Sequence, residues 1–270
     1  MQPLIILHSN DIHGQVDGLA RIATLVEDIR AQHPTTPVIY VDAGDSQDLS
    51  NPLSKATQGV AMHRLLRVAG CQMSVLGNKC MRRYGMGVVK DYALAAQFPI
   101  LQANLRLPEG SAIPGTLPSA LLPTGNIQLG FIGLTTDQSN FVNEHHLQIE
   151  SPFRVIKEQI TQLKAAGANT VILLSHMGLD MDHVLANQHF DDVALIIGGH
   201  WHVLLETGVR VNNVMITQAG SHAEYLGRVD AVWDGKQLRI EQASVIKVDS
   251  TIPQHPRVLA EIQAIESEIR

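Results

Sequence analysis

Seven side chains of the types that bind metal ions follow five short apolar runs of the sequence. The runs, residues 4–7, 38–41, 73–76, 171–174 and 193–197, are typical of buried strands. The side chains that follow them are Asp11, His13, Asp45, Asn78, His176, His200 and His202. Because ligands of α/β proteins bind beyond the carboxyl ends of the strands, where loops converge, we expect all seven to meet at one place.

Carboxylate, amide and imidazole ligands without a thiolate suit Mn²⁺, Fe²⁺/³⁺ or Zn²⁺ rather than a calcium cage or a soft-metal site. Asp11 with His13, and His200 with His202, are spaced two residues apart. In extended backbone such side chains project to the same side, so each pair is expected to hold one site. Asp45 follows a glycine and is the best candidate to bridge two metals about 3.5–4 Å apart.

Two such metals would favour attack on a phosphate ester. Two dications, the carboxylates of Asp11 and Asp45 and a bridging hydroxide leave a single positive formal charge, which favours a phosphate anion. The metals also lower the pKa of bound water toward neutrality. The expected chemistry is therefore direct attack of a metal-bridging hydroxide, without a protein nucleophile.

Amphipathic stretches lie between several of the apolar runs, which predicts an α/β fold with a largely parallel sheet. Apolar residues share one helical face over residues 19–29 and again over residues 62–69. A third helix is expected after Ser151 as its N-cap and Pro152 as its first residue, with Gly167 as its stop.

Three further segments carry predictions of their own. Residues 108–125 are rich in proline and glycine and predict an irregular excursion before a strand over residues 127–132. Residues 214–217, 228–233 and 237–246 predict strands of an antiparallel sheet, with Asp234 and Gly235 as a hairpin turn. The helical spacing over residues 258–269 predicts an apolar face that docks on this domain, on a missing segment or on a partner.

The composition limits the kinds of partner. The 270 residues are 45% hydrophobic and carry a net charge of −6, so the chain can bury a sizeable core but lacks an overall basic field for a nucleic-acid polymer. Cys71 and Cys80 fit neither a disulfide framework nor a CxxC motif. No signal peptide and no membrane-spanning stretch is visible, so a cytoplasmic location is expected, or a periplasmic one if a leader was removed.

In order, the motifs D-x-H, GD, GN, H and GHxH resemble the signature of the calcineurin-like metallophosphoesterases. The 5′-nucleotidase branch of that family is similar over further segments: LHSNDIHG (7–14), DAGD (42–45), NPLS (51–54), ANL (103–105), GFIGLTT (130–136), SHMG (175–178), GGHWH (198–202) and QAGSHAEYLGRVD (218–230). The resemblance implies a four-layer α-β-β-α sandwich with two mixed sheets, as a single catalytic domain over residues 1–270.

The resemblance also implies the function and the division of the ligands. It implies a metal-dependent hydrolase of a small phosphorylated molecule, such as a nucleotide, with two divalent ions, Mn²⁺ first and Fe or Zn as alternatives. One metal would be held by Asp11, His13 and His202, and the other by Asn78, His176 and His200, with Asp45 as the bridge. The branch also carries a C-terminal domain that holds the nucleobase, for which this chain leaves no room, so nucleoside specificity is not inferred.

The chain departs from the family where the motif normally continues GNHE and here reads GNKC. Lys79 stands in the place of the catalytic histidine, and Arg82 falls near the acid that supports it. We predict that Lys79 acts in catalysis together with Asn78 and His176, either as a proton donor or by neutralising charge on the phosphoryl group. Arg82 and His222 are predicted to contact the substrate; the alternative is that Lys79 and Arg82 point to solvent.

Two other functions remain open at this stage. A sulfur-ester hydrolase of the same branch also departs from GNHE and would keep the same metal site. A metal-binding interaction module with decayed catalytic residues is the third reading, but the complete set of seven ligands argues against it. Four other histidines, His145, His146, His183 and His189, are predicted to be surface or loop residues.

Overall fold

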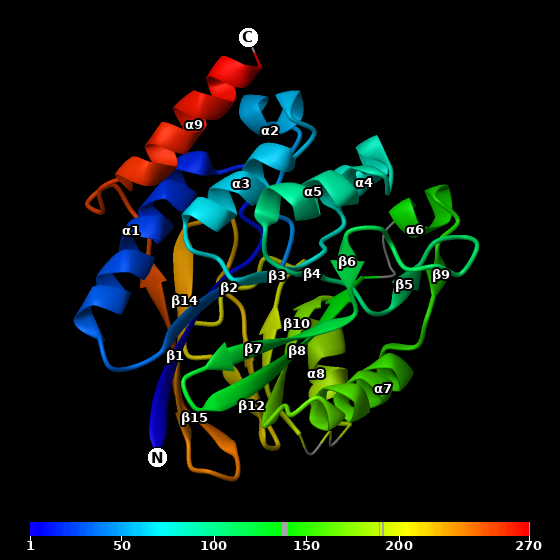
Figure 1. Ribbon diagram of the computed structural model, residues 1–270, viewed down its shortest axis with the longest axis vertical. Coiled ribbons are helices and arrows are strands. Elements are labelled where there is room, and N and C mark those ends of the chain that lie inside the picture. The colour runs from blue at the N-terminus through cyan, green and yellow to red at the C-terminus, as the bar shows by residue number, and fades with distance from the viewer. Residues whose placement is uncertain (137–139, 189, 191, 270) are drawn as a thin grey trace.

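The structure is a computed structural model that describes residues 1–136, 140–188, 190 and 192–269, and only the backbone of Cys80, Arg82 and Phe141 (Figure 1). Its main feature is a pair of mixed sheets packed face to face. The strands of the first sheet, in order across it, are β15 (Leu238–Lys247), β14 (Tyr225–Trp233), β1 (Gln2–Ser9), β2 (Val38–Asp42), β3 (Met73–Val75), β4 (Ile100–Leu101) and β6 (Thr116–Leu117). Strands β1 to β4 and β6 are parallel, whereas β14 and β15 extend the sheet in antiparallel fashion.

The second sheet contains the other two strands that lead into the predicted site. Its order is β12 (Val209–Val211), β13 (Val214–Thr217), β11 (Val193–Gly198), β10 (Thr170–His176), β8 (Ile127–Thr135) and β7 (Ser119–Thr124). The four central strands are parallel, and the edge strands β12 and β7 are antiparallel to their neighbours. A small ladder joins β5 (Leu105–Arg106) to β9 (Gln148–Ile149).

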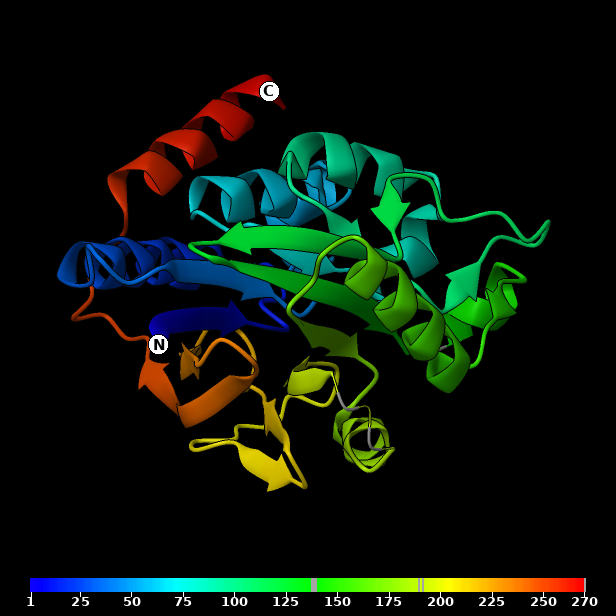
Figure 2. The same ribbon diagram turned by 60° about the horizontal axis from the view of Figure 1, so that its bottom comes forward.

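Helices cover the outer face of each sheet and complete four layers. They are α1 (Val16–Gln32), α2 (Pro52–Ala56), α3 (Val60–Val68), α4 (Lys79–Tyr84), α5 (Val88–Ala96), α6 (Asn140–Glu144), α7 (Pro152–Ala165), α8 (Leu179–Ala186) and α9 (Pro256–Glu268). Figures 1 and 2 show α1, α3 and α9 on the side of the first sheet and α7 and α8 on the opposite side. The predicted α-β-β-α sandwich with two mixed sheets is confirmed.

Three apolar clusters hold the layers together. The cluster between the sheets includes Ile6 and Val41 from the first sheet and Phe131 and Leu174 from the second, all buried. A second cluster packs the helices α1, α3 and α9 against the outer face of the first sheet. A third packs α7 and α8 against the second sheet. The central strands β1, β2, β3, β10 and β11 are thus buried on both faces, which explains the continuous apolar runs in the sequence.

The residues predicted to begin and end α7 are only partly confirmed in those roles. Pro152 is its first residue, and Gly167 follows it with φ +99°, a left-handed conformation that suits glycine at a helix end. Ser151 precedes the helix as predicted, and its backbone carbonyl accepts from the amides of Arg154 and Val155. Its side chain, however, forms no capping hydrogen bond.

Two predictions about sheet membership were wrong. Residues 119–124, expected to be irregular, form the edge strand β7, where Pro123 is tolerated because an edge strand leaves one side unpaired. The end of the chain does not form a sheet of its own, because β13 pairs in parallel with β11 whereas β14 and β15 join the first sheet. The turn at Asp234 is confirmed, since its carboxylate accepts from the amides of Lys236 and Gln237.

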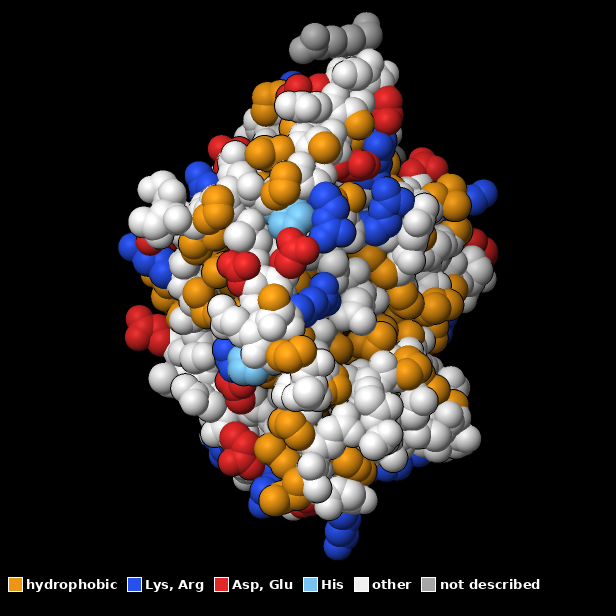
Figure 3. All heavy atoms as spheres, turned by 60° about the vertical axis from the view of Figure 1, so that its left-hand side comes forward, with side chains coloured by type: hydrophobic (Ala, Val, Ile, Leu, Met, Phe, Trp, Pro, Cys, Tyr) orange, Lys and Arg blue, Asp and Glu red, His pale blue; other side chains and the backbone are white. Residues whose placement is uncertain are grey.

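The C-terminal helix α9 docks on this same domain. Val258 and Ile265 are buried against α1 and α3, and the Arg64 side chain on α3 donates to Glu261 at 2.7 Å. Figure 3 brings this side of the molecule forward and shows basic side chains next to acidic ones. Among the described residues, no helix combines the length and apolar character needed to cross a bilayer.

Candidate metal centre

The loops that follow β1, β2, β3, β10 and β11 converge where the carboxyl ends of the two sheets meet. The Asp11 amide donates to the Gly44 carbonyl at 2.8 Å, and the His13 amide donates to the Asp45 carbonyl at 3.0 Å. From the second sheet, the His200 amide donates to Asp11 Oδ2 at 2.9 Å. Hydrogen bonds thus join these loops, the loops after β3 and β10 contact the loop after β2 through Asp45 and Ala43, and the predicted convergence of all five is observed.

The ligand residues do not have the extended backbone that the two-residue spacing suggested. Positive φ angles between 48° and 79° occur at five of them: Asp11, His13, Asp45, His200 and His202. Non-glycine residues seldom adopt this left-handed conformation, which costs about 1–3 kcal/mol at each position and gathers at functional sites. The pairs still face one site, but tight turns rather than strand pleats direct them there.

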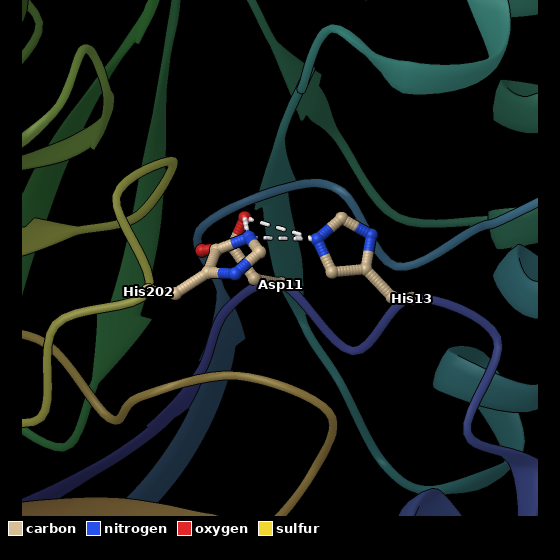
Figure 4. A group of neighbouring side chains, drawn as sticks. All are labelled: Asp11, His13 and His202. Atoms are coloured by element: carbon tan, nitrogen blue, oxygen red, sulfur yellow. Dashed lines mark hydrogen bonds and ion pairs between the residues drawn. The ribbon is translucent and has the colours of Figure 1, made fainter.

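Asp11, His13 and His202 form the first candidate metal group (Figure 4). Both imidazole rings approach the Asp11 carboxylate, with Oδ1 lying 3.6 Å from His13 Nε2 and 3.4 Å from His202 Nε2. The two Nε2 atoms are only 2.9 Å apart. Asp11 Oδ1 is buried and has no hydrogen-bond partner among the described atoms, whereas Oδ2 accepts from Asn10 and from the His200 amide.

Asp45, His176 and Asp11 form the second candidate group, and Asn78 lies against it. His176 Nε2 is 3.3 Å from Asp45 Oδ2 and 3.2 Å from Asn78 Oδ1. His176 Nδ1 lies 2.7 Å from the Ala43 carbonyl oxygen, an acceptor, so Nδ1 carries the proton and Nε2 can present a lone pair to a cation. The His200 ring stands beside this group, with its centroid 5.2 Å from that of His176.

The carboxylate common to both groups is that of Asp11, whereas the sequence placed Asp45 between two metals. Asp45 directs Oδ1 to the amides of Asn78 and Lys79, at 2.7 and 2.9 Å, and keeps Oδ2 toward His176. A Cβ on Gly77 would lie 2.1 Å from Asp45 Oδ1, so a glycine is required there. The bridging role of Asp45 therefore stays a prediction, and its orientation is fixed by the loop after β3.

The titratable groups at the centre strongly affect one another. Burial alone would lower the pKa of His176, but the carboxylates of Asp45 and Asp11 outweigh it and raise that pKa to about 9. Burial would raise the pKa of Asp11, but the neighbouring His13, His202 and His176 and the Asn10 amide outweigh it and hold that pKa well below its usual range. Burial and the charge of His176 lower the pKa of His200. The site thus concentrates negative charge that a cation could neutralise.

The structure describes the side chains of two of the three residues predicted to contact the substrate, Lys79 and His222. Lys79 begins α4 with its side chain about half exposed, and its Nζ lies 3.9 Å from Asp48 Oδ2. His222 is brought to the first group: its ring centroid is 5.3 Å from that of His13 and 5.8 Å from that of His202. The Arg82 side chain lies outside the described residues. Substrate contact by Lys79 and His222 stays a prediction.

Sequence reasoning missed several polar residues around the centre. Asn10 donates to Asp11 Oδ2 at 2.9 Å and to the Gly220 carbonyl at 2.7 Å, which ties the loop of His222 to the ligand loop. Asp48, at the rim, lies near both His13 and Lys79. Each stands close to a predicted ligand in the sequence, which was the only signal available.

Two buried acids, Asp42 and Asp182, accept hydrogen bonds from the loops and strand ends that carry the predicted ligands. Asp42 accepts from the Ser9 hydroxyl at 2.6 Å and from the Gly44 amide at 3.0 Å, and burial raises its pKa to about 7. Asp182 on α8 accepts from the Ser175 hydroxyl, and burial raises its pKa to about 7 as well. Both hold the residues next to ligands rather than the ligands themselves.

The histidines predicted to be unrelated to the site lie outside both groups where they are described. His146 is exposed after α6, His145 is half-buried beside it, and His183 is half-buried on α8. His189 lies outside the described residues.

Comparison with known proteins gives the family. A model described as calcineurin-like phosphoesterase matches residues 4–204. The 5′-nucleotidase of Mus musculus is 27% identical over 300 residues, which cover 96% of this chain and 51% of that protein. The chain therefore spans about half the length of the curated relatives it matches.

Solved structures share the fold. A 5′-nucleotidase precursor of Thermus thermophilus matches with a TM-score of 0.84 and 22% identity, over 99% of this chain and 59% of that chain. The sulfate thiohydrolase SoxB of the same organism matches with a TM-score of 0.82 and 20% identity, over 99% and 61% of the two chains. At these identities the likeness concerns the fold alone. Because the family model matches most of its length, the chain belongs to the calcineurin-like phosphoesterase family.

Proposed function

We propose that this chain is a dinuclear metal-dependent hydrolase of a small phosphorylated molecule. Calcineurin-like phosphoesterases use divalent metals, and the seven predicted ligands lie in or beside the two candidate groups. The similarity to proteins named 5′-nucleotidase supports a nucleotide as the substrate. Because those proteins are about twice as long as this chain, the nucleotide substrate belongs to the proposal.

The observation that carries the proposal is the environment of Asp11 Oδ1. This buried oxygen faces Nε2 of His13, His202 and His176 at 3.6, 3.4 and 3.9 Å, and it lacks a hydrogen-bond partner in the described chain. Buried carboxylate oxygens are normally paired, because leaving one unpaired costs about 1–3 kcal/mol or more. One carboxylate oxygen and three imidazole nitrogens that converge on the same point form a set of ligands that fits a shared cation.

The chain's residues have distinct tasks in this proposal. Asp11, His13 and His202 would hold one divalent ion, and Asp45, Asn78, His176 and His200 would hold the other, with the Asp11 carboxylate common to both groups. Such ions supply Lewis acidity for the phosphoryl oxygens and hydroxide at neutral pH. The Ala43 carbonyl keeps the His176 proton on Nδ1.

Residues at the rim would bind the substrate. Lys79, whose amide is held by Asp45, presents its half-exposed ammonium as a counter-charge for the phosphoryl group. His222, exposed beside the first group, is the proposed polar contact on the opposite loop. Neither residue is needed to hold a metal.

The test is a panel of nucleotides, sugar phosphates and a thiosulfate ester, assayed with Mn²⁺. His200→Ala is expected to lower kcat/KM for the best phosphate ester by at least about a hundredfold, because even outer partners of metal ligands contribute 10–100-fold. The matched control is His146→Ala, an exposed histidine outside both groups, which should leave kcat/KM unchanged. Turnover of the sulfur ester alone would contradict the proposed bond, and full metal content without any turnover would favour an interaction module.

A further inference from the structure

Asp48 lies between the first metal group and Lys79, and its two carboxylate oxygens have separate surroundings. Oδ1 accepts from the Ser50 amide at 2.8 Å and from the Ser50 hydroxyl at 2.7 Å. Oδ2 lies 3.6 Å from His13 Nδ1 and 3.9 Å from Lys79 Nζ. One oxygen is thus anchored in its own loop, whereas the other faces two nitrogen donors of the site.

The loop that carries Asp48 is fixed to the turn that carries His13. The Gly14 amide donates to the Ser46 carbonyl at 2.8 Å, and the Asn51 side chain donates to the Gly14 carbonyl at 2.7 Å. The Asp48 amide donates to the Ser54 hydroxyl at 3.1 Å. Hydrogen bonds on both sides of Asp48 therefore hold its backbone beside the turn of His13, and the two bonds from Ser50 orient its carboxylate.

Lys79 is held at its backbone, and its half-exposed side chain extends toward Asp48. Its amide donates to Asp45 Oδ1, which places the start of α4 at the second metal group. Of the described acidic side chains, Asp48 is the one that forms an ion pair with Lys79 Nζ.

We propose that Asp48 is a positioning residue that holds both His13 and Lys79 in the reactive arrangement. A cation bound by His13 at Nε2 requires the ring proton on Nδ1, a buried nitrogen that has no hydrogen-bond partner among the described atoms and lies 3.6 Å from Asp48 Oδ2. The same oxygen restrains the Lys79 ammonium at the rim of the site, where it can reach a phosphoryl oxygen. The acidic partner of Lys79 thus comes from the loop after β2 and not from α4, where Arg82 stands. This inference rests on the proposed function.

Asp48→Asn separates this role from a structural one. The asparagine oxygen can keep both hydrogen bonds from Ser50, but its amide turns a donor toward His13 and Lys79. The matched control is Asp230→Asn, which removes the carboxylate of an ion pair with Arg228 on β14, with a contact of 2.8 Å. Equal thermal stability of the two variants would show that Asp48→Asn is folded.

The first readout is Mn²⁺ binding by equilibrium dialysis, which does not require turnover. Asp48→Asn is expected to weaken binding by about tenfold to a hundredfold through His13, as loss of an outer carboxylate does. Lys79→Met and Asp230→Asn are expected to leave the affinity unchanged or, for Lys79→Met, slightly stronger. Unchanged Mn²⁺ affinity in Asp48→Asn would overturn the link to His13.

The second readout is a double-mutant cycle on kcat/KM with a phosphate ester that the wild type hydrolyses. Lys79→Met is expected to lower kcat/KM by about tenfold or more in the wild-type background, but by less than about threefold in Asp48→Asn, because coupled residues are not additive. Asp48→Glu should recover part of the loss. Effects that simply multiply would overturn the link to Lys79. If the wild type hydrolysed no phosphate ester, the proposed function would fail, while the Mn²⁺ measurement would still decide the role of Asp48 toward His13.

Discussion

The ligand residues of this site adopt backbone angles that their residue types disfavour. The positive φ angles at Asp11, His13 and Asp45 are maintained by hydrogen bonds between the loops after β1 and β2. The sequence could indicate which residues are candidate metal ligands, because residue type and position after a strand are local properties. It could not indicate the left-handed turns, because these depend on bonds between loops that are distant in the chain.

Gly77 shows how little room the site leaves at one position. A Cβ there would lie 2.1 Å from Asp45 Oδ1 and 2.5 Å from the Asp45 amide nitrogen. Gly77→Ala is expected to displace Asp45 and weaken Mn²⁺ binding by about tenfold or more. The matched control is Gly87→Ala, since a Cβ at Gly87 meets no atom within 4 Å. Equal metal affinity in the two alanine variants would show that Asp45 is not restricted in this way.

Proton release should accompany metal binding. In the metal-free protein the neighbouring carboxylates raise the pKa of His176 to about 9, so its ring is protonated at neutral pH. A metal needs the neutral ring, so binding must displace this proton, and affinity should fall as the pH falls below about 9, by up to about tenfold per pH unit. Calorimetry at pH 7.5 in buffers of different ionisation enthalpy should detect the released proton. A binding enthalpy that is independent of the buffer would contradict this expectation.

At the scale of elements, helix α9 was predicted correctly, but what it packs against could not be read from the sequence. Its apolar spacing left open whether this domain, another segment or a partner covers it. The structure places Val258 and Ile265 in the cluster with α1 and α3. Residues far apart in the chain supply that surface, and a helical period reveals only the face that needs covering.

Two isoleucines of the same C-terminal segment test this docking. Ile265 is 1% exposed and Ile269 is 45% exposed. Ile265→Ala is expected to lower the free energy of unfolding by roughly 2–5 kcal/mol, through lost burial and the cavity left behind. Ile269→Ala should change it by no more than about 0.5 kcal/mol. Urea unfolding of both variants measures the difference, and equal effects would contradict docking on this domain.

The contact between α3 and α5 includes a buried histidine that should make stability depend on pH. His63 stacks on Tyr92 at 4.4 Å, and neither of its ring nitrogens has a hydrogen-bond partner in the part of the chain that is described. Burial lowers the pKa of His63 to about 3. In the unfolded chain the His63 side chain has a pKa near 6.5. It therefore binds a proton as the pH falls below 6.5, whereas in the folded chain it stays neutral.

His63→Phe should remove this dependence while keeping the stack on Tyr92. In the wild type, the free energy of unfolding should fall as the pH decreases from 6.5 toward 3. His63 alone should account for about 1.4 kcal/mol of this fall per pH unit. Unfolding in urea at pH 7.5 and pH 5.0 should therefore show a smaller loss in the variant than in the wild type. The comparison is between pH values, so any packing cost of the larger ring cancels. An identical loss in both proteins would show that His63 is not buried in its neutral form.

At the scale of the whole molecule, the predicted convergence of the strand ends is observed, whereas the polar residues around the candidate ligands were not predicted. Five strand ends were expected to converge, and they do, although β1, β2 and β3 belong to one sheet and β10 and β11 to the other. Residue types and strand periodicity predicted a parallel sheet, whereas the division into two sheets followed only from the family resemblance. The strand at residues 119–124 was missed, because its proline and the neighbouring glycines suggested a loop.

The central claim is that one chain holds two metals through a shared set of loops. Metal analysis of protein reconstituted with Mn²⁺ tests it most directly, with Asp11→Asn as the comparison, because the Asp11 carboxylate belongs to both groups. The predicted result is two divalent ions per wild-type chain and loss of both in Asp11→Asn. One ion or none in the wild type, or two ions retained in Asp11→Asn, would contradict the two-metal site.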